Sequence, residues 1–264
     1  MFDNRDHTFS ICAYGESPFL EACIKSIVNQ DVVTNIIMTT STFNTHIKKL
    51  ADSYGIPLFF NENSTGIASD WNFSFEQAQT ALVTIAHQDD IYCENYTDQA
   101  LHHINETPNP LIFFSNYYEL RNDQIVKENR LLNTKRLLLR PLKSKARQNS
   151  VFWRRRILSI GSVICCPSVT LVKQVLPSQI FYSNFNNNLD WDAWEKLSHA
   201  KGSFVYCPDI LMYHRIHESS ATSEFIRDKT RSDEDLQMFM RFWPKPIAKM
   251  INAFYSRSQK SNSL

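Results

Sequence analysis

The chain has 264 residues, of which 43% are hydrophobic and 21% charged, and its formal net charge is +1. Such a composition is ordinary for a globular protein and excludes general disorder, while the length allows one large domain or two small ones. The six cysteines form no CxxC pair and no His/Cys cluster at zinc spacing, so we expect reduced thiols in a cytoplasmic protein.

Short apolar runs alternate with amphipathic stretches from the N-terminus to Ala86. The runs predict strands at 8–14, 35–40, 56–61 and 82–86, and the amphipathic stretches predict helices at 17–29, 45–54 and 67–80. Gly15 ends the first strand, and Gly55 caps the second helix. Strands and helices that alternate in this way predict a parallel sheet with helices packed on it.

The fourth predicted strand runs directly into the sequence His87, Gln88, Asp89 and Asp90. In open α/β sheets, ligands bind at the carboxyl ends of the strands. A divalent cation, Mn²⁺ or Mg²⁺, would keep two adjacent carboxylates ionised there and would neutralise charge on a departing diphosphate. The alternative is that Asp89 and Asp90 only cap the next helix.

Beyond the acidic pair, the pattern predicts helices at 98–104, 168–175 and 190–200, and strands at 110–118, 160–166 and 204–207. The segment 127–156 shows little regular pattern. Residues 223–264 carry apolar side chains amid Lys and Arg, which predicts a helical, amphipathic tail. This tail either packs on its own domain or lies on a membrane surface.

The charge of the chain is unevenly distributed. Between Lys127 and Arg156 there are eleven Lys or Arg and one acid, Glu128, so this segment carries +10 and the remainder −9. Such a block is either a solvated face or mobile loop, or a surface that contacts phosphate on a nucleotide, a polyprenyl-diphosphate acceptor or an anionic membrane. We expect no nucleic acid partner, because no recognised binding motif accompanies the basic run.

Several enzyme classes are excluded by motifs that the sequence lacks. The five glycines form neither a GxGxxG fingerprint nor a GxxxxGK[ST] loop, which excludes dinucleotide-binding dehydrogenases and P-loop enzymes. No GxSxG elbow is present, which argues against a serine hydrolase of that type.

Four separated segments share an order and spacing with a known family. They are Phe9 to Glu16 with the helix that follows, Asn72 through Asp90, Leu189 to Trp194, and Tyr213 to His217 followed by Ser219 and Ser220. Together they resemble the family-2 glycosyltransferases of the GT-A fold over roughly residues 8–222. The resemblance implies an α/β fold of Rossmann-like type, with a mixed, mostly parallel sheet flanked by helices.

The resemblance also implies a domain organisation. A catalytic GT-A domain would span residues 1–222, with a nucleotide-sugar-binding half up to about residue 100 and an acceptor half from about 101 to 222. Residues 223–264 would follow as a helical C-terminal tail.

Matching positions imply the donor and metal contacts. Donor-binding residues would be Ala13, Tyr14, Glu16, Thr39, Asn72, His87, Gln88, Asp90 and Arg215. Asp89 matches the final acid of the DxD-type motif and is the expected ligand of Mn²⁺ or Mg²⁺, with His217 as a second metal contact. The alternatives are core packing for Tyr14 and a solvent-exposed position for Asn72.

Asp190 matches the position of the family's general base. An inverting transfer needs a carboxylate that takes the proton of the acceptor hydroxyl as its oxygen attacks the anomeric carbon. Asp190 could instead be an N-cap, and Asp192, two residues on, points elsewhere on the helix. Trp191 and Trp194 are expected to stack on acceptor sugars, with core packing as the alternative.

Two positions depart from the family pattern. The second strand ends in Thr39 to Thr42, where the family has acidic residues that hold the base or ribose, and His87 replaces the first acid of the DxD-type motif. Histidine still hydrogen-bonds a ribose or phosphate, or binds metal as neutral imidazole.

The leading hypothesis is an inverting hexosyl- or related transferase of cell-surface polysaccharide assembly. The donor would be a nucleotide sugar, most commonly a UDP-sugar, and the acceptor a glycan or a polyprenyl-diphosphate-linked sugar. The enzyme would be cytoplasmic, with peripheral contact at the inner face of the plasma membrane. The alternative is a non-catalytic subunit that binds nucleotide sugars or acts as a scaffold in a glycan-assembly complex.

Overall fold

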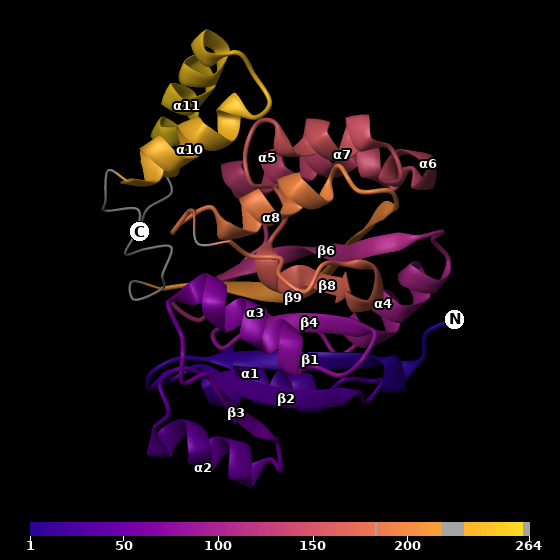
Figure 1. Ribbon diagram of the computed structural model, residues 1–264, viewed down its shortest axis with the longest axis vertical. Helices are drawn as coiled ribbons and strands as arrows, with labels where there is room; N and C mark the ends of the chain where they lie inside the picture. The colour runs from indigo at the N-terminus through magenta and orange to yellow at the C-terminus, as the bar shows by residue number, and fades with distance from the viewer. Residues whose placement is uncertain (183, 218–229, 261–264) are drawn as a thin grey trace.

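The computed structural model describes residues 1–182, 184–217 and 230–260. Its strands are β1 (His7–Ala13), β2 (Asn35–Thr40), β3 (Leu58–Phe60), β4 (Leu82–His87), β5 (Ile91–Tyr92), β6 (Pro110–Arg121), β7 (Gln124–Val126), β8 (Val169–Val172) and β9 (Ser203–Ile216). They form one central sheet in the order β3-β2-β1-β4-β8-β6-β9-β5, with β7 paired to β6 (Figure 1).

Helices cover both faces of this sheet. They are α1 (Leu20–Val28), α2 (Thr45–Ser53), α3 (Ile67–Gln77), α4 (Tyr96–Asn105), α5 (Arg130–Leu139), α6 (Lys145–Gln148), α7 (Val151–Leu158), α8 (Leu189–Leu197), α10 (Thr230–Met240) and α11 (Lys245–Lys260). One hydrophobic core joins α1, α2 and α4 to the sheet. A second core joins α3, α7, α8, α10 and α11 to it.

The alternation of side chains along β6 explains why two cores form. Ile112 and Phe114 belong to the core on the α8 side, whereas Phe113 between them belongs to the core on the α1 side. Successive side chains of a strand point to opposite faces, so a strand that is buried on both faces must be apolar at consecutive positions. Five consecutive residues of β6, from Leu111 to Ser115, are buried accordingly.

The strand directions bring several strand ends to one edge of the sheet. Strand β1 runs parallel to β2 and β4, and Cys12 lies opposite both Thr39 and His87. Strand β8 runs antiparallel to β4 and β6, so β6 is parallel to β4, and β9 is parallel to β6. The carboxyl ends of β1, β4, β6 and β9 therefore share one edge, which is where ligands bind in such sheets.

The predicted fold class is confirmed. The chain forms a mixed, mostly parallel sheet flanked by helices, with helices at its C-terminal end. The strands predicted in the first third match β1 to β4, because each is a short apolar run bounded by turn residues.

Two predicted elements are wrong, and they are adjacent. The segment 160–166 contains no strand, and 168–175 contains strand β8 where a helix was predicted. Short apolar runs fit a buried strand or a buried helix equally well, so periodicity did not separate them. The β-branched Val169, Thr170 and Val172 pair with β4 and β6, and this tertiary pairing sets their conformation.

The segment 127–156, in which no regular pattern was recognised, is mostly helical. It contains α5, α6 and most of α7. Leu132, Leu139 and Leu142 are buried and hold this segment on the sheet. Only a few of its apolar side chains are buried, and many Lys and Arg lie between them. The helical spacing of the buried positions was therefore not recognised in the sequence.

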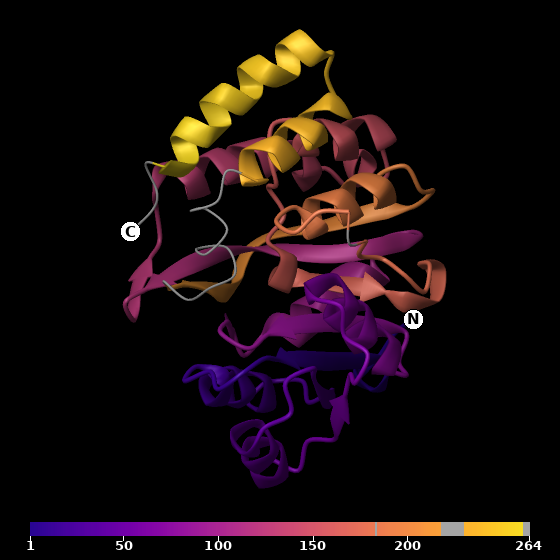
Figure 2. The ribbon, with the colours of Figure 1, turned by 60° about the vertical axis from the view of Figure 1, so that its left-hand side comes forward.

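The predicted tail is helical over the part that the structure describes. Figure 2 shows α10 and α11 on the side of the molecule away from β1, β2 and β3. Met238, Phe239 and Ala248 are fully buried in the same core as α8. None of the described helices has the length and hydropathy needed to cross a membrane. A domain boundary at residue 222 stays a prediction.

Candidate active site

The acidic pair lies at the carboxyl end of β4, in a tight turn. The backbone N–H of Asp90 donates to the carbonyl of His87 at 3.2 Å and so folds the chain back on itself. One ligand atom from each of His87, Asp89 and Asp90 lies within 4.8 Å of the others. These three side chains form what we call the acidic cluster.

Two polar atoms of the acidic cluster lack a partner. His87 Nε2 and Asp90 Oδ2 are buried and make no hydrogen bond in the structure. Buried polar atoms nearly always have a partner, so two unpartnered atoms within a group of converging ligand atoms are consistent with a ligand at this place. A divalent cation accepts imidazole nitrogen and carboxylate oxygen together. The acidic cluster therefore fits a metal ion.

Strand β9 delivers a second set of side chains to the cluster. Asp90 Oδ1 lies 2.9 Å from His214 Nδ1 and accepts the backbone N–H of Arg215, also at 2.9 Å. His217 Nε2 lies 3.0 Å from Asp89 Oδ2. Strand β5, which begins right after Asp90, pairs with β9 through Ile91 and Tyr213, and this pairing fixes the approach of β9.

The carboxylates and imidazoles of the site stabilise each other's charged forms. Burial alone would raise the pKa of Asp89, but the hydrogen bond from His217 and the neighbouring imidazoles lower it. Burial opposes the charged form of His214, yet the Asp90 carboxylate outweighs it and raises the pKa of His214. Asp89 is thus kept as a carboxylate, the form that binds metal.

The ring of His87 is fixed by an aromatic neighbour, and its contact with a donor stays a prediction. Its ring stacks on Trp71, with centroids 5.0 Å apart and planes inclined by 21°. Burial lowers the pKa of His87, while the carboxylates of Asp90, Asp89 and Asp190 act in the opposite direction. A neutral imidazole fixed by stacking, with its Nε2 in the acidic cluster, suits metal ligation.

Asp190, the predicted base, is the second residue of α8, so its carboxylate is held at the start of that helix. Its Oδ1 accepts the backbone N–H of Trp191 at 2.7 Å, and its Oδ2 accepts the hydroxyl of Ser162 at 3.2 Å. Burial raises the pKa of Asp190 against these hydrogen bonds. The helix that carries Asp190 is linked to His87 by ring contacts, from His87 to Trp71, from Trp71 to Phe181 and from Phe181 to Trp194 of α8.

Several predicted donor residues gather at the same edge. Gln88 accepts the backbone N–H of Tyr14 and donates to its carbonyl, both at 2.9 Å, so the amide ties β1 to β4. Ala13 is buried at the end of β1, whereas Tyr14 is 63% exposed and Glu16 is exposed. Their contact with a donor stays a prediction.

Arg215 is buried beside the acidic cluster. Its Nε donates to the carbonyl of Asp89 at 3.0 Å, and its guanidinium lies 4.3 Å from the ring of Phe19. A further ion pair joins Arg215 to Asp123, whose side chain is 85% exposed. The positive charge is therefore fixed next to the acidic cluster, and its contact with a diphosphate stays a prediction.

Thr39 and Asn72 make hydrogen bonds within the protein. Thr39 is buried, and its hydroxyl is hydrogen-bonded to that of Ser74. Asn72 donates to the carbonyl of Phe181 at 2.7 Å and accepts the backbone N–H groups of Ile180 and Phe181. Both side chains thus hold helix α3 to its neighbours. Thr39 is a correction to the sequence analysis, because its hydroxyl is buried, whereas contact of the half-buried Asn72 with a donor stays a prediction.

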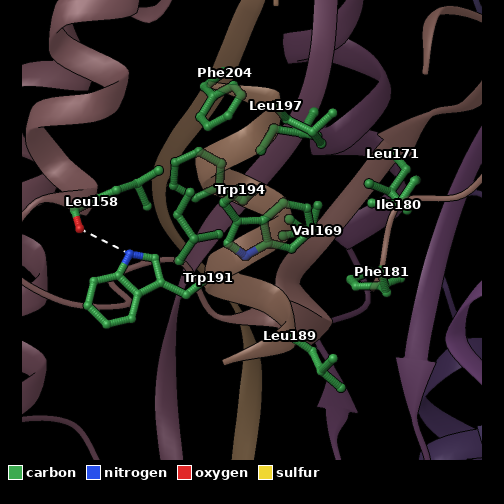
Figure 3. Packing of buried hydrophobic residues seen from close by; sticks show 14 of the residues in the cluster. Leu158, Val169, Leu171, Ile180, Phe181, Leu189, Trp191, Trp194, Leu197 and Phe204 are labelled. Atoms are coloured by element: carbon green, nitrogen blue, oxygen red, sulfur yellow. Dashed lines mark hydrogen bonds between the residues drawn. The ribbon is translucent and has the colours of Figure 1, made fainter. Parts of the chain in front are cut away.

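Trp191 and Trp194 are core residues, which corrects their expected role in acceptor binding. Their exposed fractions are 0% and 1%, so neither ring has a face open to a sugar. Figure 3 shows both indoles among apolar side chains, with Trp191 Nε1 donating to the carbonyl of Leu158 at 3.0 Å. Apolar neighbours on both sides of α8 explain the burial, and the sequence pattern alone did not reveal them.

Lys135 of α5 lies near the acidic cluster and was not identified from the sequence. Its Nζ donates to the hydroxyl of Tyr117 at 3.0 Å, and the ring of Tyr117 lies 5.9 Å from that of His214. The charge of Lys135 acts on Asp190 as well. The spacing of Leu132, Lys135 and Leu139 places all three on one helix face, and this was the signal available in the sequence. Ser219 and Ser220 lie outside the described residues.

Solved structures of other proteins share this fold. The structure is similar to S. aureus TarS 1-349 in complex with UDP-GlcNAc, with a TM-score of 0.64 and 14% identity over 97% of this chain and 73% of that chain. It is similar to a mannosyltransferase from Pyrobaculum calidifontis in complex with GDP-Man and Mn²⁺, with a TM-score of 0.59 and 14% identity over 95% and 69% of the two chains.

A third similar structure is glucosyl-3-phosphoglycerate synthase from Mycobacterium tuberculosis in complex with UDP, with a TM-score of 0.58 and 15% identity over 90% of this chain and 80% of that chain. Identities this low show a shared fold. A sequence comparison with curated proteins finds no match. The model of glycosyl transferase family 2 matches residues 8–161, more than half of the 264 residues. The chain therefore belongs to glycosyl transferase family 2 and is a glycosyltransferase.

Proposed function

We propose that this chain is an inverting glycosyltransferase that moves a sugar from a nucleotide-sugar donor to an acceptor hydroxyl. One observation carries the proposal. Ligand atoms of His87, Asp89 and Asp90 converge within 4.8 Å, and two atoms of the cluster are buried without partners. Helix α8, which carries Asp190, is linked to His87 by ring contacts through Trp71 and Phe181.

The acidic cluster would hold Mn²⁺ or Mg²⁺, with His217 behind Asp89 as a further contact. When bound, the cation supplies positive charge for the departing nucleoside diphosphate. Arg215 adds a fixed guanidinium beside the same place. Ala13, Tyr14 and Glu16 would line the nucleobase and ribose. We propose a UDP-sugar as donor, and similar structures contain UDP-GlcNAc and UDP.

Asp190 would take the proton of the acceptor hydroxyl. The hydrogen bonds from Trp191 N–H and Ser162 fix the orientation of its carboxylate. Because burial raises its pKa, Asp190 is a stronger base than an ordinary aspartate. A base must combine correct position with a pKa not far from the working pH, and Asp190 is shifted in that direction.

Donor binding is the first test of the proposal. In a thermal-shift panel of UDP- and GDP-sugars, the true donor at about 100 times its Kd should raise Tm by about 5–10 °C with Mn²⁺ present. EDTA should remove the shift. No response to any nucleotide sugar would contradict the proposal, and binding without transfer across many acceptors would favour the non-catalytic alternative.

The acceptor would be a glycan or a polyprenyl-diphosphate-linked sugar in cell-surface polysaccharide assembly. We place the enzyme in the cytoplasm, with peripheral contact at the inner face of the plasma membrane. Ile247, Met250 and Phe254 of α11 support this contact, since they are 39%, 56% and 65% exposed. Their spacing puts them on one side of the helix, next to the exposed Lys245 and Lys249.

Flotation with vesicles that contain phosphatidylglycerol tests the membrane contact. The double variant Met250→Ser/Phe254→Ser should bind about a hundredfold more weakly, because two large apolar side chains no longer enter the headgroup boundary. The double variant Val33→Ser/Phe43→Ser is the control, since these side chains are 67% and 52% exposed but lie far along the chain from α11. Equal flotation of wild type and the α11 variant would refute the contact.

A further inference from the structure

A hollow with basic walls opens apart from the acidic cluster. It has a volume of about 580 Å³ and lies between α5, the segment Arg140–Lys143 and strands β6 and β9. The residues that line it include neither Asp190 nor any residue of the acidic cluster. Ile210, on its wall, precedes His214 by four residues, which is about 13 Å along a strand. We call this hollow the basic pocket.

The cations of the basic pocket have no acidic partners. Arg136, Arg140 and Lys143 line it, and no acid is among its lining residues. In the described parts of the chain, Arg140 and Lys143 take part in no ion pair, whereas the nearby Lys145 is paired with Glu106 at 2.8 Å. Two acids adjoin lining residues in sequence without lining the pocket: Asp209 is exposed, and Glu119 is buried and paired with Arg121 at 2.9 Å. The pocket thus concentrates positive charge that the protein itself does not neutralise.

The walls of the basic pocket are fixed by hydrogen bonds. Arg136 donates to the carbonyls of Lys127 and Tyr117 at 3.0 and 3.1 Å, and its guanidinium lies 5.5 Å from the ring of Tyr118. Asn116 is buried; it donates to the carbonyl of Pro208 at 2.7 Å and accepts the hydroxyl of Tyr206 at 3.0 Å. Arg136 and Asn116 are thus held in place before a ligand binds, which reduces the entropy lost on binding, whereas Arg140 and Lys143 are exposed at the rim.

We propose that the basic pocket binds a diphosphate group carried by the acceptor substrate. Three cations around one hollow match an anion with several charges, and guanidinium groups bind phosphate oxygens in pairs. The volume exceeds what a diphosphate alone needs, so the group attached to it also fits. The assignment to the acceptor rests on the proposed function, but the binding of diphosphate does not.

Calorimetry with inorganic pyrophosphate tests the pocket on the full chain, in EDTA so that no metal ion contributes. The double variant Arg140→Gln/Lys143→Gln should bind pyrophosphate at least about tenfold more weakly, because it loses charge-assisted hydrogen bonds. The double variant Lys245→Gln/Lys249→Gln removes the same charge from exposed positions on α11 and should bind like wild type. Equal affinity in all three proteins would overturn the proposal, as would equal losses in both variants.

Two further measurements distinguish a diphosphate pocket from failure of the proposed function and from a membrane-binding surface. UDP binding with Mn²⁺ should be unchanged in the Arg140/Lys143 variant, because its residues lie outside the acidic cluster. If no nucleotide sugar binds the wild type, the proposed function fails, while a selective loss of pyrophosphate binding still supports the pocket. If the variant loses binding only to phosphatidylglycerol vesicles and not to pyrophosphate, the residues serve a membrane surface and the pocket proposal is refuted.

Discussion

Replacing Asp190 with Asn should lower kcat by about 10²–10⁴-fold, the usual contribution of a general base, while donor affinity stays at the wild-type level. The amide has the shape of the carboxylate, and its oxygen still accepts the N–H of Trp191. It cannot accept the proton of the acceptor hydroxyl. Donor titration and turnover measured on one preparation separate the two effects.

Asp192→Asn is the matched control for this variant. Asp192 is fully buried two residues along the same helix, where it contacts Lys196 at 2.8 Å and Arg241 at 2.6 Å. Its replacement should lower Tm and leave kcat near that of wild type. Wild-type turnover in the Asp190 variant would refute the assignment.

The pH dependence of transfer offers a second view of Asp190. The base must be ionised to act, and burial raises its pKa above the ordinary value for aspartate. Turnover should therefore fall as the pH drops through this raised pKa, rather than only near pH 4 as for an exposed aspartate. The residual activity of the Asp190 variant should not show this acidic limb.

Replacing Asp89 with Asn should remove both metal binding and transfer. Loss of a residue that only orients a ligand costs about 10–100-fold in metal affinity, so loss of a ligand should cost at least about 100-fold. The amide carries no charge, and His217 loses the carboxylate that it contacts at 3.0 Å. Titration with Mn²⁺, followed by electron paramagnetic resonance, measures the affinity directly.

Asp123→Asn is the control for the metal variant. Asp123 contacts Arg215 at 2.6 Å, yet its side chain is 85% exposed, and ion pairs that exposed contribute little. Its replacement should leave Mn²⁺ affinity and transfer almost unchanged. Transfer that persists in EDTA would show that the acidic cluster holds no essential metal.

The first half of the fold was predictable because its signals are local. Strands β1, β2 and β4 are short apolar runs that end at turn residues, and the acidic pair follows directly after one of them. The parallel arrangement then brings the strand ends together. Local pattern and topology agree here, so the position of Asp89 and Asp90 follows from the sequence.

The second half depends on contacts between distant segments. Strand β8 forms because β4 and β6 offer partners on both sides, and no local pattern near Val169 distinguishes this from a helix. Trp191 and Trp194 are buried because α7 and α10 cover α8, as the edge-to-face contact of Trp191 with Phe239, with ring centroids 5.1 Å apart, shows. The stacking of Trp71 on His87 likewise joins α3 to the end of β4, a contact that no local sequence pattern announces.

Strand β9 carries a consequence for biosynthesis. The acidic pair stands near the first third of the chain, but its partners His214 and His217 are translated more than a hundred residues later. Chains fold from the N-terminus as they emerge from the ribosome. An incomplete polypeptide that ends at residue 161, where the family match stops, holds Asp89 without Asp190 or His217. The nascent chain therefore completes the contacts of Asp89 and Asp90 with His217 and His214 only after its last strand has been inserted.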